Sequence, residues 1–416
     1  MIVFTDYKYK GVGGVGQIVV NTVLELNRKG QTAKVYASHE SYEYKRLVEE
    51  KAECILIDSE TAGLKEFATR LDKEDVIFLT HINNNELLKE IKHINNRLIF
   101  YVVHPDTFFI ESWFFRLFNF KKKALHLISL LDNKKALLLM DRPNKEAIER
   151  RGLTLSEPVK YLTVPINVDQ TYKRTFDSVN AKRMITYVGR GNDDWKIYPV
   201  IKVLSDLNKM SEEYIFTICT DTDKRFKELI ALHVPDNKVK IEYKINLFGH
   251  ALDDFLKINS WLHISMGTSA LEGAKLGIPT ILIDYSKSLF PEDYGYKWLY
   301  EADGYSLADE ILPGMTIKGL PLRQMIKEIE FSNGYNTVAD QCFDYVLNNH
   351  SLDVFLQRFL EACQQTEMTV KDYCNTSLHT FLLYIKPLYT YSYLGILGIL
   401  HPKKAIKKII KIIYGK

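Results

Sequence analysis

Short apolar runs alternate with stretches of helical periodicity through the first part of the chain. Apolar runs occur at 2–5 (IVFT), 34–38 (KVYAS), 54–58 (CILID), 76–80 (VIFLT), 97–103 (RLIFYVV) and 135–140 (KALLLM). Between the first two, an amphipathic stretch at 17–29 has the helical spacing and ends at Gly30. Strands that alternate with helices predict a parallel, doubly wound sheet.

The same alternation starts again after a polar stretch at 166–182, which is typical of a linker. The new apolar runs occur at 183–190, 213–220, 238–245, 261–265 and 280–284. A chain of 416 residues is too long for one ordinary core. We therefore expect two Rossmann-like α/β domains, at 1–168 and 169–345, followed by a helical C-terminal region at 346–416.

Composition narrows the class of protein. Hydrophobic residues make up 46% of the chain and charged residues 26%, as in globular proteins. The five cysteines are scattered and lack C-x-x-C spacing, which argues against a disulfide framework or a zinc site and fits a reducing cytoplasm. The first residues lead directly into a strand pattern, so we expect no signal peptide. The body is mildly acidic without a broad basic stripe, so we expect no nucleic-acid partner.

The glycine-rich stretch GVGGVG at 11–16 lies between the first strand and the first helix. It formally matches the dinucleotide-binding pattern, but a single match is weak, and YKYK separates these glycines from the strand. A nicotinamide site, and with it an NAD-dependent oxidoreductase, therefore stays an alternative. We favour a loop in which Gly13 and Gly14 let a ligand phosphate approach the backbone; a plain surface loop is the third possibility.

The stretch at 263–284, HISMGTSALEGAKLGIPTILID, has the pattern of a strand, a tight turn, a helix and a second strand. The turn consists of Gly267, Thr268 and Ser269. Backbone N–H groups at such a helix start bind anions, and the helix dipole reinforces this. Glu272 lies one turn into the helix, where it can accept hydrogen bonds from ligand hydroxyls. The alternative is an ordinary β-α-β unit with a solvated glutamate.

Two cations follow the first strand of the second domain. Arg190 ends the run RMITYVGR, and Lys196 begins the next helix six residues later. A forked guanidinium and an ammonium at this spacing can converge on one phosphate group. Asp221 and Asp223 follow the next strand and could hold a metal, although acids in that position are usually turn residues and helix caps. We expect no metal.

Two histidines follow neighbouring strands of the first domain. His104 comes directly after 97–103, on the edge of a parallel sheet where ligands bind. It is a candidate for hydrogen bonding to substrate or for proton transfer, with a structural cap as the alternative. His81 ends the preceding strand and is a candidate for the acceptor side, although a structural role is favoured there.

Two segments have the composition of membrane-binding helices. In 108–123, nine of sixteen residues are apolar and seven of them aromatic; the candidate lipid contacts are Trp113, Phe114, Lys121, Lys122 and Lys123. At the C-terminus, isoleucines occupy one side of a helical wheel, and the other side carries Lys403, Lys404, Lys407, Lys408 and Lys411. This predicts a monotopic helix on an anionic membrane. An internal packing helix and a partner-binding helix are the respective alternatives. The apolar stretch at 381–400 is interrupted by Lys386 and Pro387, which argues against a spanning helix.

Taken together, YVGR-x5-K and GTSALEGAKLGIPTILID resemble retaining glycosyltransferases of the GT-B type, especially family 4, over about residues 1–365. The resemblance implies two Rossmann-like domains facing a cleft, with Arg190 and Lys196 on the donor diphosphate, Glu272 on the donor ribose and backbone amides at 267–269. It also matches the glycine-rich loop to Gly13 and Gly14, and the active-site histidine to His104. It further implies that the amphipathic helix at 348–363 crosses back to the first domain, ahead of the basic membrane-associating helices. The first glutamate of the family's Glu-x7-Glu motif is replaced here by Ile264, so how the sugar is held is open.

We therefore expect a metal-independent glycosyltransferase without a cofactor, in which a nucleotide-sugar is the donor substrate. The resemblance implies transfer with retention, and the basic tail implies a lipid-linked or surface-glycan acceptor at the inner face of the plasma membrane. An oxidoreductase and a non-catalytic sugar-binding scaffold remain as alternatives. The nucleotide, the sugar, the acceptor, the linkage and the oligomeric state do not follow from the sequence.

Overall fold

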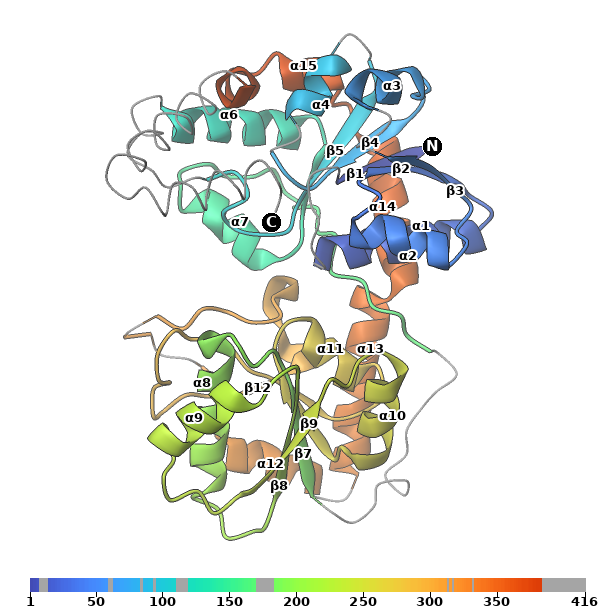
Figure 1. Cartoon of the computed structure of the whole chain (residues 1–416). Coiled ribbons are helices and arrows are strands. Elements are labelled where there is room, and N and C mark those ends of the chain that lie inside the picture. The colour runs from blue at the N-terminus through green and yellow to red at the C-terminus, as the bar shows by residue number, and fades with distance from the viewer. Residues whose placement is uncertain are drawn as a thin grey trace, which may run out of the picture. The chain divides into compact units, whose positions relative to one another are not determined.

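The computed structural model describes residues 1–6, 14–58, 63–82, 85–92, 95–109, 119–169, 183–312, 314–315, 318–330 and 333–383. The chain divides into two compact units (Figure 1). Unit 1 comprises Met1–Thr163 together with the chain from Phe355, and unit 2 comprises Val164–Val354. Each unit has its own apolar core around its own sheet.

Unit 1 is built on a six-stranded parallel sheet with the order β3-β2-β1-β4-β5-β6. Its strands are β1 (Ile2–Asp6), β2 (Ala33–Ala37), β3 (Cys54–Asp58), β4 (Val76–Leu79), β5 (Arg97–Val102) and β6 (Leu137–Leu139). Its helices are α1 (Gly14–Arg28), α2 (Tyr42–Glu49), α3 (Gly63–Thr69), α4 (Asn85–Glu90), α6 (Phe120–Asn133), α7 (Arg142–Glu149) and α15 (Val370–Cys374). The strand order reverses between β1 and β4, which is where doubly wound folds bind ligands.

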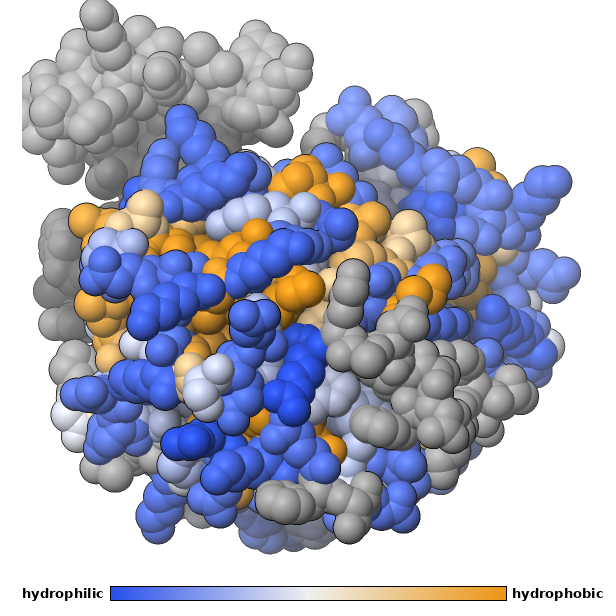
Figure 2. All heavy atoms as spheres, turned by 90° about the horizontal axis from the view of Figure 1, so that it is seen from below, coloured by the Kyte–Doolittle hydropathy of each residue, from blue (hydrophilic) through white to orange (hydrophobic). Residues whose placement is uncertain are grey.

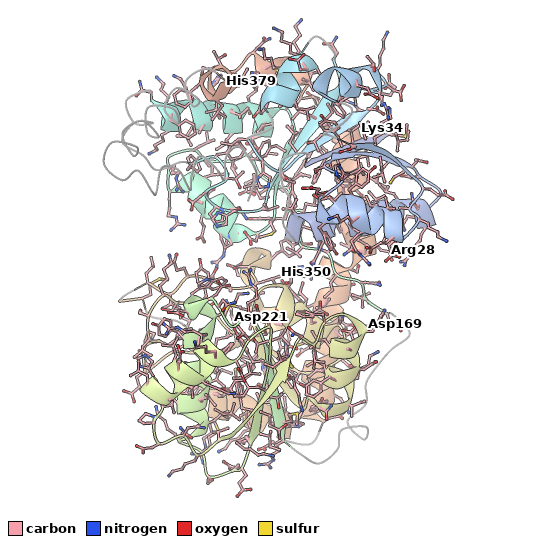
Figure 3. The ribbon with its side chains drawn as sticks, in the orientation of Figure 1. Arg28, Lys34, Asp169, Asp221, His350 and His379 are labelled. Carbon is pink, nitrogen blue, oxygen red and sulfur yellow. The ribbon has the colours of Figure 1, made fainter. Side chains whose placement is uncertain are left out.

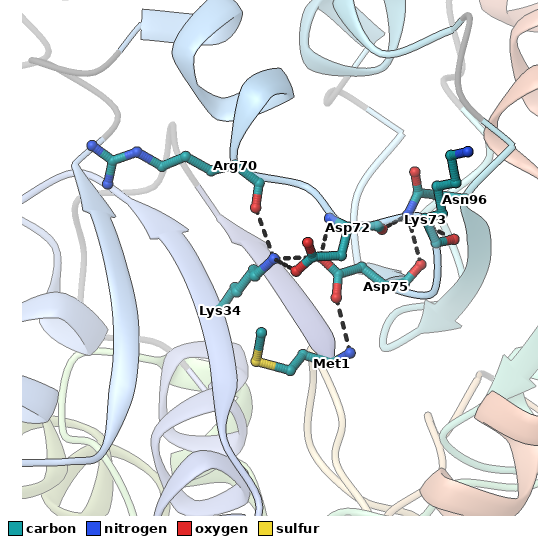
Figure 4. A network of polar contacts seen from close by, with 7 residues as sticks. All are labelled: Met1, Lys34, Arg70, Asp72, Lys73, Asp75 and Asn96. Atoms are coloured by element: carbon teal, nitrogen blue, oxygen red, sulfur yellow. Dashed lines mark hydrogen bonds and ion pairs between the residues drawn. The ribbon is translucent and has the colours of Figure 1, made fainter.

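A buried lysine ties three strands of unit 1 together (Figure 4). Lys34 lies in β2 with only 3% of its side chain exposed. Its ammonium donates to Asp72 and Asp75, each at 2.6 Å, and to the Arg70 carbonyl at 2.7 Å. The fully buried Asp75 also accepts from the Met1 amine at 2.8 Å. Because a buried charge is costly unless it is paired, this network is what allows a lysine inside a buried strand.

Unit 2 repeats the same strand order around β7. Its strands are β7 (Met184–Val188), β8 (Ile215–Thr220), β9 (Lys240–Ile245), β10 (Leu262–Ser265), β11 (Thr280–Leu282) and β12 (Lys297–Trp298), in the order β12-β11-β10-β7-β8-β9. Its helices are α8 (Asp194–Leu207), α9 (Lys224–His233), α10 (His250–Asn259), α11 (Thr268–Ala274), α12 (Leu322–Glu330) and α13 (Gly334–His350), and two 3-10 turns lie at Leu299–Glu301 and Asp303–Tyr305. β12 is antiparallel to β11, and the other pairings are parallel. Two doubly wound, Rossmann-like sheets confirm the predicted fold class.

The chain after unit 2 completes the core of unit 1. Helix α14 (Leu352–Gln365) begins at the end of unit 2, and its residues from Phe355 onward belong to unit 1. Beyond it, Leu98 donates its backbone N–H to the Met368 carbonyl and Val370 donates to the Asn96 carbonyl, both at 2.9 Å. The apolar side chains of this segment that are buried in unit 1 are Met368, Val370, Tyr373, Leu378, Phe381 and Leu382. The chain from Met368 to Leu382 therefore contributes to the core of unit 1.

Most residues of the predicted membrane segments fall outside the described residues. These are 110–118, with Trp113 and Phe114, and 384–416, with the five C-terminal lysines. Lys121, Lys122 and Lys123 are described, in the first turn of α6, where the first two are exposed. No helix in the described ranges is long and apolar enough to cross a membrane. One face of the molecule carries a band of hydrophobic residues among hydrophilic ones (Figure 2).

Candidate functional site

The predicted ligand residues of unit 2 lie at the point where its strand order reverses. β7 and β10 are neighbours, with Thr186 opposite His263 in the register. At their carboxyl ends, the Ser265 hydroxyl donates to the Val188 carbonyl at 2.9 Å. The loop that carries Arg190 and the turn at Gly267 therefore leave the sheet side by side, at the edge where doubly wound folds bind ligands.

The loop after β7 is fixed by close contact with the loop after β8. A Cβ on Gly191 would lie 1.9 Å from the Thr222 carbonyl oxygen, so only glycine fits there. The Gly191 N–H donates to Asp221 Oδ1 at 2.7 Å (Figure 3 labels Asp221 in unit 2). Burial opposes ionisation of Asp221, but this bond and one from Thr220 outweigh it and lower the pKa of the carboxyl. Asp221 is thus a loop anchor, as expected of an acid at this position.

Asp223 precedes α9 and pairs with Lys227. In the part of the chain that the structure describes, no group of three or more His, Cys, Asp or Glu side chains is arranged to hold a metal.

Arg190 and Lys196 come close enough to repel each other. The Arg190 guanidinium is 68% exposed and pairs with Asp193 at 3.1 Å. Lys196 lies in the first turn of α8, with its ammonium 5.0 Å from the centre of the Trp195 ring. Burial lowers the pKa of Lys196 and Arg190 lowers it further, against the opposing effect of Asp193 and Asp221. No acidic side chain of the described residues lies within ion-pairing distance of Lys196, so an anionic ligand would stabilise its charged form.

The turn into α11 requires a glycine. Gly267 has φ +59°, in the region that favours glycine, and its N–H donates to the Leu307 carbonyl at 2.7 Å. Thr268 and Ser269 then form the first turn of a helix that is only seven residues long. The Gly267 amide is therefore already used, and the amides that this turn offers a ligand belong to Thr268 and Ser269.

A buried histidine, which sequence reasoning did not single out, sets the position of α11. His263 Nε2 donates to the Ser269 carbonyl at 2.9 Å, and Nδ1 lies 2.9 Å from the Thr186 hydroxyl. A Cβ on Gly273 would lie 2.5 Å from the imidazole ring, so the helix packs directly on it. Burial lowers the pKa of His263 to about 4. The sequence did contain a signal for this contact. A histidine lies between apolar strand residues, and a glycine in the following helix comes ten residues later.

Glu272 is held by a lysine that the sequence did not identify as part of the site. The carboxylate is 29% exposed and pairs through Oε2 with Lys275 on the next turn of the helix. Lys275 is 12% exposed and also pairs with Asp253 of α10 at 2.9 Å. Burial lowers the pKa of Lys275, but the two carboxylates outweigh it and raise it. Glu272 is thus an oriented carboxylate and not a freely solvated one.

The position that departs from the resembled pattern lies inside the sheet. Ile264 is in β10, opposite Ile281 of β11, and is fully buried in the apolar core of unit 2. A side chain at this position faces the core and not the edge where Gly267 begins the turn. A carboxylate here would be buried without partners, so this chain holds any sugar without a glutamate at position 264.

In unit 1, the glycine-rich stretch leads into α1. Gly13 lies outside the described residues, and Gly14 begins the helix in an open position. A Cβ on Gly16 would lie 3.2 Å from the Tyr42 ring and 3.3 Å from Glu43 Oε2, so this glycine lets α1 pack closely on α2. The role of Gly13 and Gly14 toward a donor stays a prediction.

The two histidines of unit 1 follow neighbouring strands, as expected. Leu79 at the end of β4 pairs with Phe100 of β5, so both strands end at one sheet edge. His104 is 70% exposed, and its Nδ1 accepts from the Asp106 N–H at 3.1 Å, which leaves Nε2 toward solvent. Asp106 in turn pairs with Arg151 at 3.1 Å. Burial lowers the pKa of His81, which fits the structural role favoured for it.

Two doubly wound units of this strand order, linked by a C-terminal helix that joins unit 1, define the GT-B fold, and solved structures share it. No protein-family model matches the sequence, and no curated protein matches it either. A glycosyltransferase from Rickettsia africae ESF-5 is 16% identical with a TM-score of 0.60, covering 87% of this chain and 97% of its own. HepE of Anabaena, in complex with UDP and glucose, is 11% identical with a TM-score of 0.54, covering 87% and 99%. The lipopolysaccharide outer core galactosyltransferase WaaB is 14% identical with a TM-score of 0.50, covering 87% and 98%.

Proposed function

We propose that the protein is a glycosyltransferase that uses a nucleotide-diphosphate-sugar donor, bound at the carboxyl edge of the unit 2 sheet. The observation that carries the proposal is the placement of Arg190 and Lys196 at the strand-order reversal, where Lys196 has no ion-pair partner among the described residues. A diphosphate is a ligand that would pair with both cations. The GT-B fold supports the proposal, since its named representatives include glycosyltransferases.

The proposed chemistry follows from where charge develops. As the bond from the sugar C1 to the diphosphate oxygen breaks, negative charge builds on the leaving group, and fixed cations lower that barrier. Arg190 and Lys196 take this role in the proposal, so the reaction needs no metal and no cofactor. The amides of Thr268 and Ser269 lie on the neighbouring loop and add hydrogen bonds to the diphosphate or the sugar.

Transfer with retention is proposed from the sequence resemblance. The acceptor oxygen forms its bond to C1 on the face that the diphosphate leaves, and the acceptor proton passes to the departing phosphate oxygen. No protein base is then needed at the reacting carbon. His104, with Nε2 toward solvent, binds substrate hydroxyls on the unit 1 side, and the open backbone at Gly14 lies on the same edge of that sheet.

A lipid-linked or surface-glycan acceptor at the inner face of the plasma membrane completes the proposal. It rests on the alternation of isoleucines and lysines at 403–413 and on Trp113, Phe114 and the lysines at 121–123. Three other aromatic residues of the segment 108–123 are buried in the core of unit 1 and take no part, namely Phe108, Phe109 and Phe120. Aromatic side chains at the acyl boundary and lysines on anionic headgroups would hold the enzyme beside such an acceptor.

Donor hydrolysis and transfer by single-site variants test the function. Screening nucleotide-sugars by thermal shift first identifies the donor, since binding to the folded state raises the melting temperature. Arg190→Ala and Glu272→Ala should then each lower kcat/KM for that donor, Arg190→Ala by about tenfold or more because a charge-assisted bond is lost. Unchanged activity in both variants would overturn the site. Donor binding without turnover on any acceptor would favour the sugar-binding scaffold, to which the buried Ile264 lends some support.

A further inference from the structure

Three charged side chains form a chain of contacts beside the proposed ribose ligand. Asp253 of α10 lies 2.9 Å from the Lys275 ammonium, and the same ammonium pairs with Glu272 Oε2 on α11. Their side-chain exposures are 18%, 12% and 29% for Asp253, Lys275 and Glu272 respectively, so Lys275 is the most buried of the three and Glu272 the most exposed. The lysine therefore lies between two partly exposed carboxylates, of which Glu272 reaches furthest into solvent.

The arrangement leaves one oxygen of Glu272 open. The Lys275 ammonium forms ion pairs with Asp253 Oδ1 and with Glu272 Oε2. Oε1 of Glu272 has no hydrogen-bond or ion-pair partner among the described residues. A carboxylate fixed through one oxygen presents the other in a set direction, so a ligand hydroxyl need not restrict a free side chain on binding.

Lys275 also lies at a place where it can direct Glu272. It is the cap residue directly after α11, and its backbone N–H donates to the Leu271 carbonyl at 2.9 Å. Because residues three apart are neighbours on a helix surface, the lysine reaches back to the glutamate while Asp253 holds it from the other helix. Moving either partner would let the carboxylate rotate.

We propose that Lys275, held by Asp253, is a positioning residue that aims Glu272 at the vicinal hydroxyls of the donor ribose. The inference rests on the proposed function, because it assigns the ligand of the same site. Lys275 itself acts through Glu272. A ligand that lacks the two hydroxyls gains nothing from the aimed carboxylate, so the positioning effect is confined to ligands that carry them.

Calorimetric titration with paired ligands tests this. The nucleoside diphosphate that binds wild type, chosen from UDP, GDP, ADP and CDP, is compared with its 2′,3′-dideoxy form. Wild type should prefer the ribose form by about tenfold or more, the value expected of hydrogen bonds to a charged group. Glu272→Gln and Lys275→Met should both cut this preference severalfold, and Lys275→Arg should keep most of it. Lys209→Met, which removes an ion-paired lysine elsewhere in unit 2, is the matched control.

The outcomes separate the inference from the function on which it rests. A purely structural Lys275 would weaken both ligands equally in Lys275→Met, together with a lower melting temperature, and that result would overturn the inference. If Lys275→Met does not fold, the two ligands are compared in Asp253→Asn, which keeps the shape of the side chain. An unchanged preference for the ribose form in that variant would also overturn the inference. If neither Glu272→Gln nor Arg190→Ala alters binding, the proposed donor site itself is wrong.

Discussion

His263 shows how much of the site depends on one buried neutral side chain. Its imidazole joins β7 to the first turn of α11 through Thr186 and the Ser269 carbonyl. The sequence predicted the turn at 267–269 and the acid at 272, because glycine, small residues and a helix pattern mark them locally. It did not predict that His263 holds the turn or that Lys275 holds Glu272. The first contact depends on packing between strands that are distant in the chain, and the second depends on the direction of the side chains.

At the residue scale, the stability of the protein should fall on mild acidification because of His263. Its pKa is about 4 in the folded state against a usual value of 6.5, so between these values the unfolded chain binds the extra proton. Stability is therefore complete above the unfolded value and is lost as the pH falls toward 4. Between pH 7 and pH 5, the protonation of His263 in the unfolded chain should lower the free energy of unfolding by about 2 kcal/mol.

Urea unfolding of wild type and His263→Gln at both pH values measures this contribution. The variant should be less stable at pH 7 and should lose about 2 kcal/mol less than wild type on acidification. Equal losses in the two proteins would show that His263 is not buried in its neutral form.

At the element scale, the alternation of apolar runs predicted most strands to within a residue or two. The run at 54–58 is β3, and the run at 280–284 contains β11. The two-residue β12 was not predicted, because so short a segment has no periodicity and its pairing with β11 is antiparallel. The sequence did not show that residues 366–383, beyond the expected crossover helix, also pack in unit 1, since a helix that packs on a sheet and a helix that binds lipid share an amphipathic pattern.

The buried ion pairs of Lys34 in β2 lead to a prediction at the element scale. Lys34→Met should destabilise the protein by about 3–5 kcal/mol, because it leaves the fully buried Asp75 with less compensation for its charge. Burial opposes ionisation of the Asp75 carboxyl, but its bonds to Lys34 and to the Met1 amine outweigh burial and lower its pKa. The stability that these bonds provide is therefore present at neutral pH and lost as the pH falls through the lowered pKa.

Chemical denaturation at pH 7 measures the effect, with Lys29→Met as the control because the Lys29 side chain is 44% exposed and its contact with Glu25 is long, at 3.8 Å. The control should change stability by less than about 1 kcal/mol. A similarly small change in Lys34→Met would contradict the network.

At the scale of the whole molecule, the C-terminal chain has a part that packs in unit 1 and a basic part for which we propose membrane binding. The part up to Leu382 fills the core of unit 1, and the basic part begins later. A variant that ends at Tyr384 should therefore fold with an unchanged melting temperature but lose its binding to vesicles that contain anionic lipid, since it lacks the lysine-rich helix.

Vesicle flotation with neutral and anionic lipid measures this binding. A variant that ends at Glu367 is the informative comparison, because it removes Met368, Tyr373 and Phe381 from the core and should fold poorly. Retained vesicle binding in the protein that ends at Tyr384 would assign membrane contact to residues 108–123 instead.

The most direct test of the account is calorimetric binding of nucleoside diphosphates to wild type, Arg190→Ala and Lys196→Ala, with Lys209→Met as control. We predict that wild type and the control bind one nucleoside diphosphate with equal affinity and that each site variant binds it at least about tenfold more weakly, because a charge-assisted phosphate contact is lost. The corresponding nucleoside, which lacks the phosphates, should bind wild type and both variants alike. Equal diphosphate affinity in all four proteins would contradict the donor site at the carboxyl edge of unit 2.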